Sequence, residues 1–235
     1  MKIINAVDQN EMGLLAADIF AEAIRAKPNL VLGLATGSTP LTLYGELINK
    51  NKNGEIDFSQ VKTANLDEYV GLPGTHDQSY RYFMNENLFN HININLENTN
   101  VPNGMGSDPA AECARYDAII EKLGGIDLQL LGIGPNGHLG FNEPSDVFSN
   151  RTQHIQLTES TINANARFFN DLSEVPKSAI TVCIRDIMLA KKIVLVAGAE
   201  KKDIIEKALY GEITPKVPAS VLQLHQDATI ILASA

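Results

Sequence analysis

Short, almost wholly apolar runs separated by amphipathic segments constrain the fold of this 235-residue chain more than any other feature. Leu30-Val31-Leu32-Gly33-Leu34 is one such run. It lacks the polar and apolar alternation of a strand with one face in water, so it is typical of a parallel strand buried on both faces. Strands are expected at 61–66, 126–133 and 193–197 on the same grounds, and further strands at 2–7, 179–184 and 229–232.

Helical segments lie between these runs. Asp8 followed three residues later by Glu11 is a variant capping box, which predicts a helix to about Lys27. Asp108 and Pro109 are expected as the N-cap and first residue of a helix that ends at 124–125. Further helices are expected at 40–50, with Pro40 as its first residue, at 77–90, and at 201–210. This alternation predicts an α/β fold, a doubly wound, Rossmann-like, mostly parallel sheet with helices on both faces.

The length fits one domain with a full hydrophobic core, and this domain is expected to span residues 1–235. Residues 149–177 fit the alternation poorly because they are polar and only partly helical. A long segment of this kind is typical of an active-site lid, so we expect it to close over a bound substrate.

Composition and charge exclude several classes of protein. The chain is 44% apolar and 20% charged, and no apolar run approaches the roughly 18 residues that a membrane helix requires. Without signal-peptide features at the N-terminus, and with only two cysteines, a cytoplasmic location is expected. A formal net charge of −9 without a cluster of Lys and Arg argues against a nucleic-acid partner. A monomer and a homo-oligomer are both compatible with the sequence.

Ligands of open parallel sheets bind at the carboxyl ends of the strands, so the strand-to-helix junctions are the first place to look for chemistry. The first junction contains Thr36, Gly37, Ser38 and Thr39. Small residues and hydroxyl groups before a helix N-terminus suit a phosphate, although an ordinary helix-capping turn fits this stretch equally well. Because a helix terminus alone contributes only about 0.3–1 kcal/mol, basic side chains such as Arg167 and Lys201 are expected to assist.

The second junction places Asp67 and Glu68 at the end of the expected strand 61–66. A carboxylate in such a position is a candidate general base, because burial and a charged neighbour raise its pKa toward neutrality. Asp67 is the better candidate of the two. The alternative is that both carboxylates cap the next turn or are solvated, which is the commoner fate of an acidic pair in a loop.

The third junction is a Gly-rich loop at 132–144 that presents His138 and Glu143 to one cleft. Its first residues match the dinucleotide-binding spacing G-x-G-x-x-G, but Pro135 lies within the loop and no long helix precedes Pro144, so we reject that function. A carboxylate bonded to one imidazole nitrogen fixes the tautomer, which leaves the other nitrogen for proton transfer. The five histidines and two cysteines show no metal-binding spacing, so neither metal nor cofactor is expected.

Together the motifs Gly33–Pro40, Asn65–Tyr69 and Gly134–Pro144, in this order, resemble the glucosamine-6-phosphate deaminase family. The likeness extends to 165–169 and 222–225. It implies an enzyme of the hydrolase or isomerase type that converts D-glucosamine 6-phosphate to D-fructose 6-phosphate and ammonia without a cofactor.

The resemblance also implies a role for each candidate residue. Asp67 would move a proton from C2 to C1, and His138 would act on the ring hemiacetal, with Glu143 as its orienting carboxylate. Asn136, where some relatives carry Asp, would complete this network. The expected phosphate ligands are Thr36, Gly37, Ser38, Thr39, Arg167 and Lys201.

Longer relatives respond to N-acetylglucosamine 6-phosphate and place basic residues where this chain has Gln153 and Ile155. The chain also stops at Ala235, before the end of those relatives, so weak or absent activation is expected. The rival functions are a 6-phosphogluconolactonase, which needs no proton shuttle at Asp67, and a non-catalytic sugar-phosphate sensor, which would normally carry a DNA-binding module.

Overall fold

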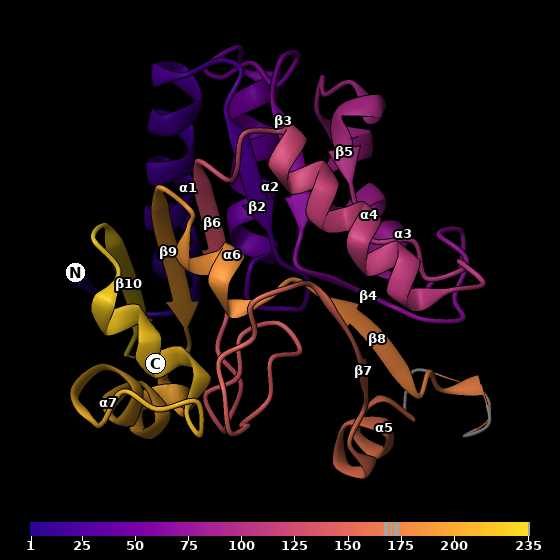
Figure 1. Cartoon of the computed structure of the whole chain (residues 1–235). Coiled ribbons are helices and arrows are strands. Elements are labelled where there is room, and N and C mark those ends of the chain that lie inside the picture. Colours follow the sequence, from indigo (N-terminus) through magenta and orange to yellow (C-terminus); the bar gives the residue numbers. More distant parts are fainter. Residues whose placement is uncertain (167–168, 170, 172–173, 235) are drawn as a thin grey trace.

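The computed structural model describes residues 1–166, 169, 171 and 174–234. Its main sheet has seven strands in the order β1-β10-β9-β6-β2-β3-β5, and every pairing between neighbours is parallel (Figure 1). The predicted fold class is therefore confirmed. The strands are β1 (Lys2–Ala6), β2 (Val31–Leu34), β3 (Lys62–Asn65), β5 (Thr99–Asn100), β6 (Leu128–Leu131), β9 (Lys192–Ala197) and β10 (Ala228–Ala233).

Helices pack on both faces of this sheet. The helices are α1 (Gln9–Ala26), α2 (Leu41–Lys52), α3 (Tyr80–Asn87), α4 (Pro109–Lys122), α5 (Glu159–Asn165), α6 (Ile184–Met188) and α7 (Lys202–Tyr210). Of these, α5 lies away from the main sheet (Figure 1). Short 3₁₀ segments lie at Phe89–His91, Leu96–Asn98, Ala199–Lys201 and Pro218–Leu224. The connections through α1 and α2 run toward β5, whereas those through α4, α6 and α7 run toward β1. Because parallel crossovers are right-handed, the two sets cover opposite faces, as α1 and α4 do in Figure 1.

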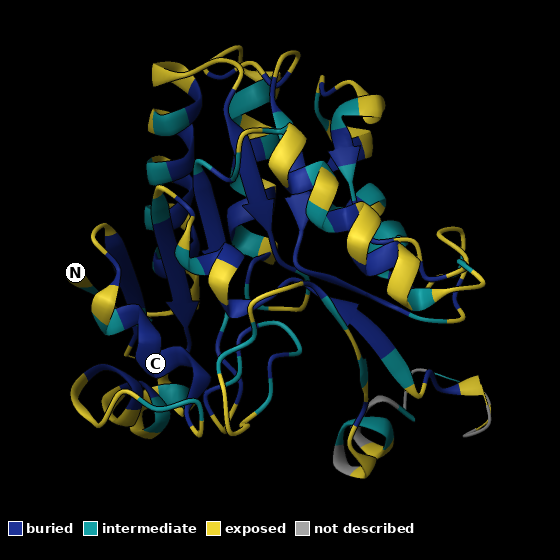
Figure 2. Ribbon diagram, in the orientation of Figure 1, coloured by how far each residue is buried: buried dark blue, intermediate teal, exposed yellow. Residues whose placement is uncertain are grey.

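The direction of winding reverses between β2 and β6, which are neighbours at the centre of the sheet. Such a reversal opens a crevice at the carboxyl ends of the strands, because the connections leave toward opposite sides. All residues of β2 and β6 are buried, as expected for strands covered on both faces, and Figure 2 shows these central strands in dark blue. The fold thus places the first and third junctions side by side.

A second sheet of three antiparallel strands was not predicted. It pairs β4 (Asp67–Tyr69), β8 (Ser178–Thr181) and β7 (Gln153–Gln156), with Asp67 and Gln153 both opposite Thr181. The single strand expected at 179–184 was wrong in its extent, because β8 ends at Thr181 and α6 begins at Ile184. Apart from Thr181 that stretch is apolar, because the strand end and the first helical turn are both buried.

Helix starts were predicted with mixed success. Asp8 caps α1 by accepting from the backbone N–H of Glu11, and Asp108 caps α4, which begins at Pro109. Pro40 is the N-cap residue of α2 rather than its first residue, and α3 begins only after Ser79, whose side chain caps it. No helix among the described residues is long and apolar enough to cross a membrane.

Gly104 allows a close approach between the main chain and β4, which carries Asp67. Its carbonyl accepts from the N–H of Gly71 at 2.8 Å, and a Cβ atom at Gly104 would lie 2.0 Å from the carbonyl oxygen of Tyr69. The added methyl group would clash with the backbone of β4, and this clash is relieved only if β4 moves. We therefore predict that Gly104→Ala lowers the free energy of unfolding by about 1–3 kcal/mol in urea denaturation.

Gly45→Ala in the exposed face of α2 is the matched control, because no atom lies within 4 Å of the added methyl group. It is expected to raise the free energy of unfolding by about 0.5–1 kcal/mol, since alanine favours helix over glycine. Equal stability of the Gly104→Ala variant and the parent protein would contradict the proposed steric contact.

Candidate active site

A cavity of about 530 Å³ lies at the carboxyl ends of β9, β6, β2 and β3, which are consecutive neighbours in the main sheet. All three predicted junctions contribute to its wall. The predicted site residues that line it are Thr36, Gly37, Ser38, Thr39, Asp67, His138 and Lys201. Segments that are distant in sequence therefore meet around one space, as the strand topology requires.

The loop between β2 and α2 forms one end of this cavity. Gly37 has φ +107°, in the left-handed region that favours glycine, and the hydroxyl group of Tyr44 donates to the carbonyl of Ala35 at 2.5 Å, which anchors the start of the loop. The backbone N–H groups of Gly37, Ser38 and Thr39 donate to no other described residue. These groups and the adjoining N-terminus of α2 are therefore available to an anion.

Lys201 approaches the same cavity from the turn after β9. It forms no ion pair with any residue in the described part of the chain, so its charge is not neutralised there. Arg167, the other predicted basic ligand, lies outside the described residues. Lys201 is thus the cation that the structure places beside the loop 36–39.

Asp67 is the first residue of β4 and is only 7% exposed. The preceding residue, Leu66, is held from two sides: its N–H donates to Leu34 of β2 at 3.1 Å, and its carbonyl accepts from Val182 at 2.7 Å. No described residue donates a hydrogen bond to the Asp67 carboxyl group. Burial, and to a smaller extent the charge of Glu68, raises the pKa of Asp67 from 3.8 to about 8.

The neighbouring carboxylate of Glu68 has a different fate. It accepts from the backbone N–H groups of Tyr69 at 2.8 Å, Tyr80 at 2.9 Å and Arg81 at 2.9 Å, and so caps the first turn of α3. Burial raises the pKa of Glu68, while these three donors oppose the rise. The alternative interpretation, in which both acids cap the next turn or are solvated, therefore holds for Glu68 but not for Asp67, which is buried and accepts no hydrogen bond from a described residue.

His138 and Glu143 meet as predicted, with 3.0 Å between Nδ1 of the imidazole and Oε1 of the carboxylate. The amide of Asn136 donates to the other carboxylate oxygen at 2.5 Å. The hydrogen bond from His138 lowers the pKa of Glu143, and the Asn136 amide adds to this effect. Because a carboxylate only accepts, this contact favours the tautomer with the proton on Nδ1, which leaves Nε2 as the ring nitrogen for proton exchange.

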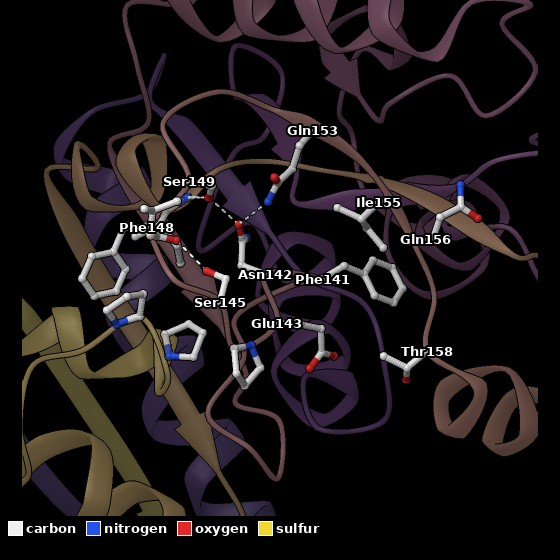
Figure 3. Close-up of a pocket in the computed structure, with 15 residues that line it drawn as sticks. Phe141, Asn142, Glu143, Ser145, Phe148, Ser149, Gln153, Ile155, Gln156 and Thr158 are labelled. Atoms are coloured by element: carbon white, nitrogen blue, oxygen red, sulfur yellow. Dashed lines mark hydrogen bonds between the residues drawn. The ribbon is translucent and has the colours of Figure 1, made fainter.

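The loop around this pair is shaped by glycines. A Cβ atom at Gly134 would lie 2.1 Å from Nε2 of His138, and one at Gly140, where φ is +58°, would lie 3.1 Å from Oδ2 of Asp67. Glu143 and Asn136 do not line the main cavity; Glu143 contacts the imidazole and lines an adjacent pocket shown in Figure 3. His138 alone therefore presents this network to a substrate.

Sequence reasoning missed two aromatic residues of the cavity wall. Tyr80 and Phe141 stack with ring centroids 6.1 Å apart and an angle of 6° between the rings. Phe141 lies within the third motif, so the sequence could have identified it as a residue of the site. No sequence pattern points to Tyr80, because it reaches the cavity only through the bond between its N–H and Glu68 at the start of α3. Across the described residues, no three His, Cys, Asp or Glu side chains gather as metal ligands.

The chain is similar to known proteins over nearly its whole length. The glucosamine-6-phosphate deaminase of Lachnoclostridium phytofermentans is 61% identical, with 98% of each chain covered. A solved monomeric glucosamine-6-phosphate deaminase is 42% identical, with a TM-score of 0.95 over 99% of this chain and 97% of that one.

A more distant structure, the 6-phosphogluconolactonase of Shewanella baltica, is 20% identical with a TM-score of 0.78, over 100% of this chain and 98% of that one. This likeness shows the fold alone. The family model for glucosamine-6-phosphate isomerases/6-phosphogluconolactonase matches residues 9–231. The chain therefore belongs to the family of glucosamine-6-phosphate isomerases and 6-phosphogluconolactonases.

Proposed function

We propose that this chain is a glucosamine-6-phosphate deaminase of amino sugar catabolism, which converts D-glucosamine 6-phosphate to D-fructose 6-phosphate and ammonia. The observation that carries the proposal is that Asp67, His138 and the loop 36–39 line one cavity. The chain is 61% and 42% identical to two glucosamine-6-phosphate deaminases over nearly its whole length, but only 20% identical to a 6-phosphogluconolactonase, with which it shares the fold. This difference favours deamination over lactone hydrolysis.

Ring opening is assigned to His138. Its Nε2 takes the proton of the C1 hydroxyl group and delivers a proton to the ring oxygen, so the bond between C1 and the ring oxygen breaks to give the open-chain aldehyde. Glu143 keeps the imidazole in the required tautomer and stabilises the imidazolium form, and the neutral amide of Asn136 holds Glu143. General acid–base groups of this kind typically contribute about 10²–10⁴-fold to the rate.

Isomerisation is assigned to Asp67. Its carboxylate removes the proton from C2, and the electron pair of that bond forms a double bond between C1 and C2. The π electron pair of the C1 carbonyl moves to O1, which takes up a proton from solvent water to give an enolamine. The same group returns the proton to C1, which leaves an imine at C2. One water molecule then adds to C2 and ammonia leaves, so the net reaction is an isomerisation coupled to a hydrolysis.

The phosphate group is assigned to Thr36, Gly37, Ser38, Thr39 and Lys201, with Arg167 as a further proposed ligand. Anchoring the substrate at its far end holds C1 and C2 near the catalytic groups, and such positioning is a large part of enzymatic rate enhancement. Closure of residues 149–177 over the substrate, the extent of a single domain over 1–235 and the cytoplasmic location stay predictions.

Replacing the proposed base tests the reaction. We predict that Asp67→Asn lowers kcat for ammonia and fructose 6-phosphate formation by at least about 100-fold, because the amide cannot accept the C2 proton. Glu200→Gln is the matched control: it makes the same change in another carboxyl group of the cavity wall, to which no role is assigned. This variant is expected to stay within about threefold of the parent protein, far below a general-base effect.

The same assay separates the rival functions. Hydrolysis of 6-phosphogluconolactone without release of ammonia from glucosamine 6-phosphate would identify a lactonase. Binding of the sugar phosphate without turnover of either compound would identify a sensor. Unchanged turnover in the Asp67→Asn variant would remove this residue from the mechanism.

The adjacent pocket bears on regulation. It has a volume of about 330 Å³, and its described lining residues include Gln153 and Ile155 but no Lys, Arg or His (Figure 3). A phosphorylated effector needs cationic or preorganised N–H donors to offset its loss of hydration. We therefore propose that N-acetylglucosamine 6-phosphate does not activate this chain, unlike the longer relatives described in the sequence analysis.

A titration of the subsaturated enzyme with N-acetylglucosamine 6-phosphate tests this proposal. The apparent KM for glucosamine 6-phosphate is expected to stay within about twofold, since an allosteric coupling of 1–3 kcal/mol would shift it about 5- to 150-fold. A fall of fivefold or more would contradict the prediction. A rise that is overcome by more substrate would instead show competition at the active site.

A further inference from the structure

We propose that Asn142 is a positioning residue that fixes the His138–Glu143 pair relative to Asp67. The proposal rests on the catalytic roles given above, and it concerns a side chain that does not line the main cavity. Asn142 is 4% exposed and directly precedes Glu143 in the loop that also carries His138.

The donor side of the Asn142 amide joins two parts of the chain. Its Nδ2 donates to the carbonyl of Leu139 at 2.9 Å and to the carbonyl of Val182 at 2.8 Å, while its backbone N–H also donates to Leu139 at 3.0 Å. The bonds to Leu139 close the turn between His138 and Glu143. The bond to Val182 attaches this turn to the segment after β8.

The acceptor side is equally well used. Oδ1 of Asn142 accepts from Oγ of Ser149 at 2.6 Å and from Nε2 of Gln153 at 3.2 Å, and Figure 3 shows both bonds converging on this oxygen. Ser149 Oγ in turn accepts from the N–H of Ile184 at 2.8 Å. The amide thus fills two donor and two acceptor positions, which is the full capacity of an asparagine side chain apart from further weak contacts.

Val182 connects this network to the proposed base. Its carbonyl accepts from Asn142, and its N–H donates to the carbonyl of Leu66, the residue before Asp67. A single peptide segment therefore ties the loop that bears His138 and Glu143 to the strand that bears Asp67. Because reacting groups lose efficiency when they are displaced by about 1 Å, this link has a direct effect on catalysis.

Asn142→Asp is the sharpest variant because it preserves shape. An aspartate in this place sets an oxygen against the carbonyl oxygens of Leu139 and Val182, so two attractive contacts become repulsive. Loss of the bond to Val182 is expected to release the loop from the segment after β8 and to misalign the imidazole, while the bond from Phe141 N–H to Thr181 Oγ1 of β8 at 3.1 Å is kept. Ser149→Ala removes one of the two bonds that Asn142 Oδ1 accepts, together with the bond that Ser149 Oγ accepts from the N–H of Ile184, and keeps both donor bonds of Asn142. It is the second variant, which serves if the first one does not fold.

The experiment compares the steady-state kinetics of both variants with binding of an acyclic analogue, the C1-reduced amino alditol 6-phosphate. We expect kcat of Asn142→Asp to fall about 10- to 100-fold by misalignment. The analogue has no ring to open, so its Kd is expected to change less than about threefold, as befits an unaltered phosphate site. Asn100→Asp is the matched control. The side-chain amide of Asn100, on strand β5, also donates to a backbone carbonyl, that of Thr63 on β3, but it lies outside the network of Asn142.

The imidazole of His138 gives a second readout that does not depend on turnover. Nitrogen-15 NMR is expected to show the proton on Nδ1 in the parent protein and a mixture of both tautomers in Asn142→Asp. If the parent protein is active and Asn142→Asp keeps its kcat and its His138 tautomer, the positioning role of Asn142 is overturned, while the proposed function of the chain stands. An inactive parent protein would refute the proposed function, and the tautomer comparison would still decide whether Asn142 orients His138. Equal losses of kcat and analogue binding would reduce Asn142 to a structural role.

Discussion

The burial of one carboxyl group, that of Asp67, governs the rest of the site. A carboxylate removed from water and without a hydrogen-bond donor among the described residues is unstable as an anion, so the pKa of Asp67 rises from 3.8 to about 8. The folded protein then binds more protons than the unfolded chain between these two pH values, and the contribution of Asp67 to stability falls as pH rises through this window. Each unit of pKa shift corresponds to about 1.4 kcal/mol, so the fold has to hold this residue in place by other contacts.

Those contacts come from the meeting of the two sheets. Leu66 leaves the main sheet bonded to β2 and enters the small sheet bonded to Val182, so the chain has no freedom to turn Asp67 toward water. Glu68 follows with its side chain fixed at the start of α3, where three backbone donors satisfy it. Two adjacent acids are thereby given opposite environments, one with donors and one without. The chemical result is a carboxyl group with a pKa of about 8, which is the value expected of a candidate general base.

Much of this architecture was accessible from sequence, for identifiable reasons. Apolar runs such as Val31–Leu34 indicated strands buried on both faces, and the alternation with helices then fixed which strand ends share an edge. The pair of His138 and Glu143 was also predictable, because they lie close together in one Gly-rich loop. The loop 36–39 was singled out as a candidate phosphate site by its small residues, and it lines the same cavity as Lys201.

The second sheet was not predictable on the same grounds. β4 has only three residues, and β7 has a half-exposed pattern with polar residues such as Gln153 and Gln156, so neither shows the apolar run of a buried strand. Their pairing through β8 joins residues more than a hundred positions apart along the chain, such as Asp67 and Thr181. Local patterns carry no information on such contacts. For the same reason the link from Asn142 through Val182 to Leu66 emerges only from the structure.

The protonation state of Asp67 in the free protein tests this account most directly. Carbon-13 NMR of the aspartate carboxyl carbons, with Asp67→Asn to assign the signal, would follow its titration. The account predicts a midpoint near pH 8, far above the ordinary value of 3.8. A midpoint close to that ordinary value would show that the carboxyl group is hydrated or hydrogen-bonded in solution, and would contradict the central claim.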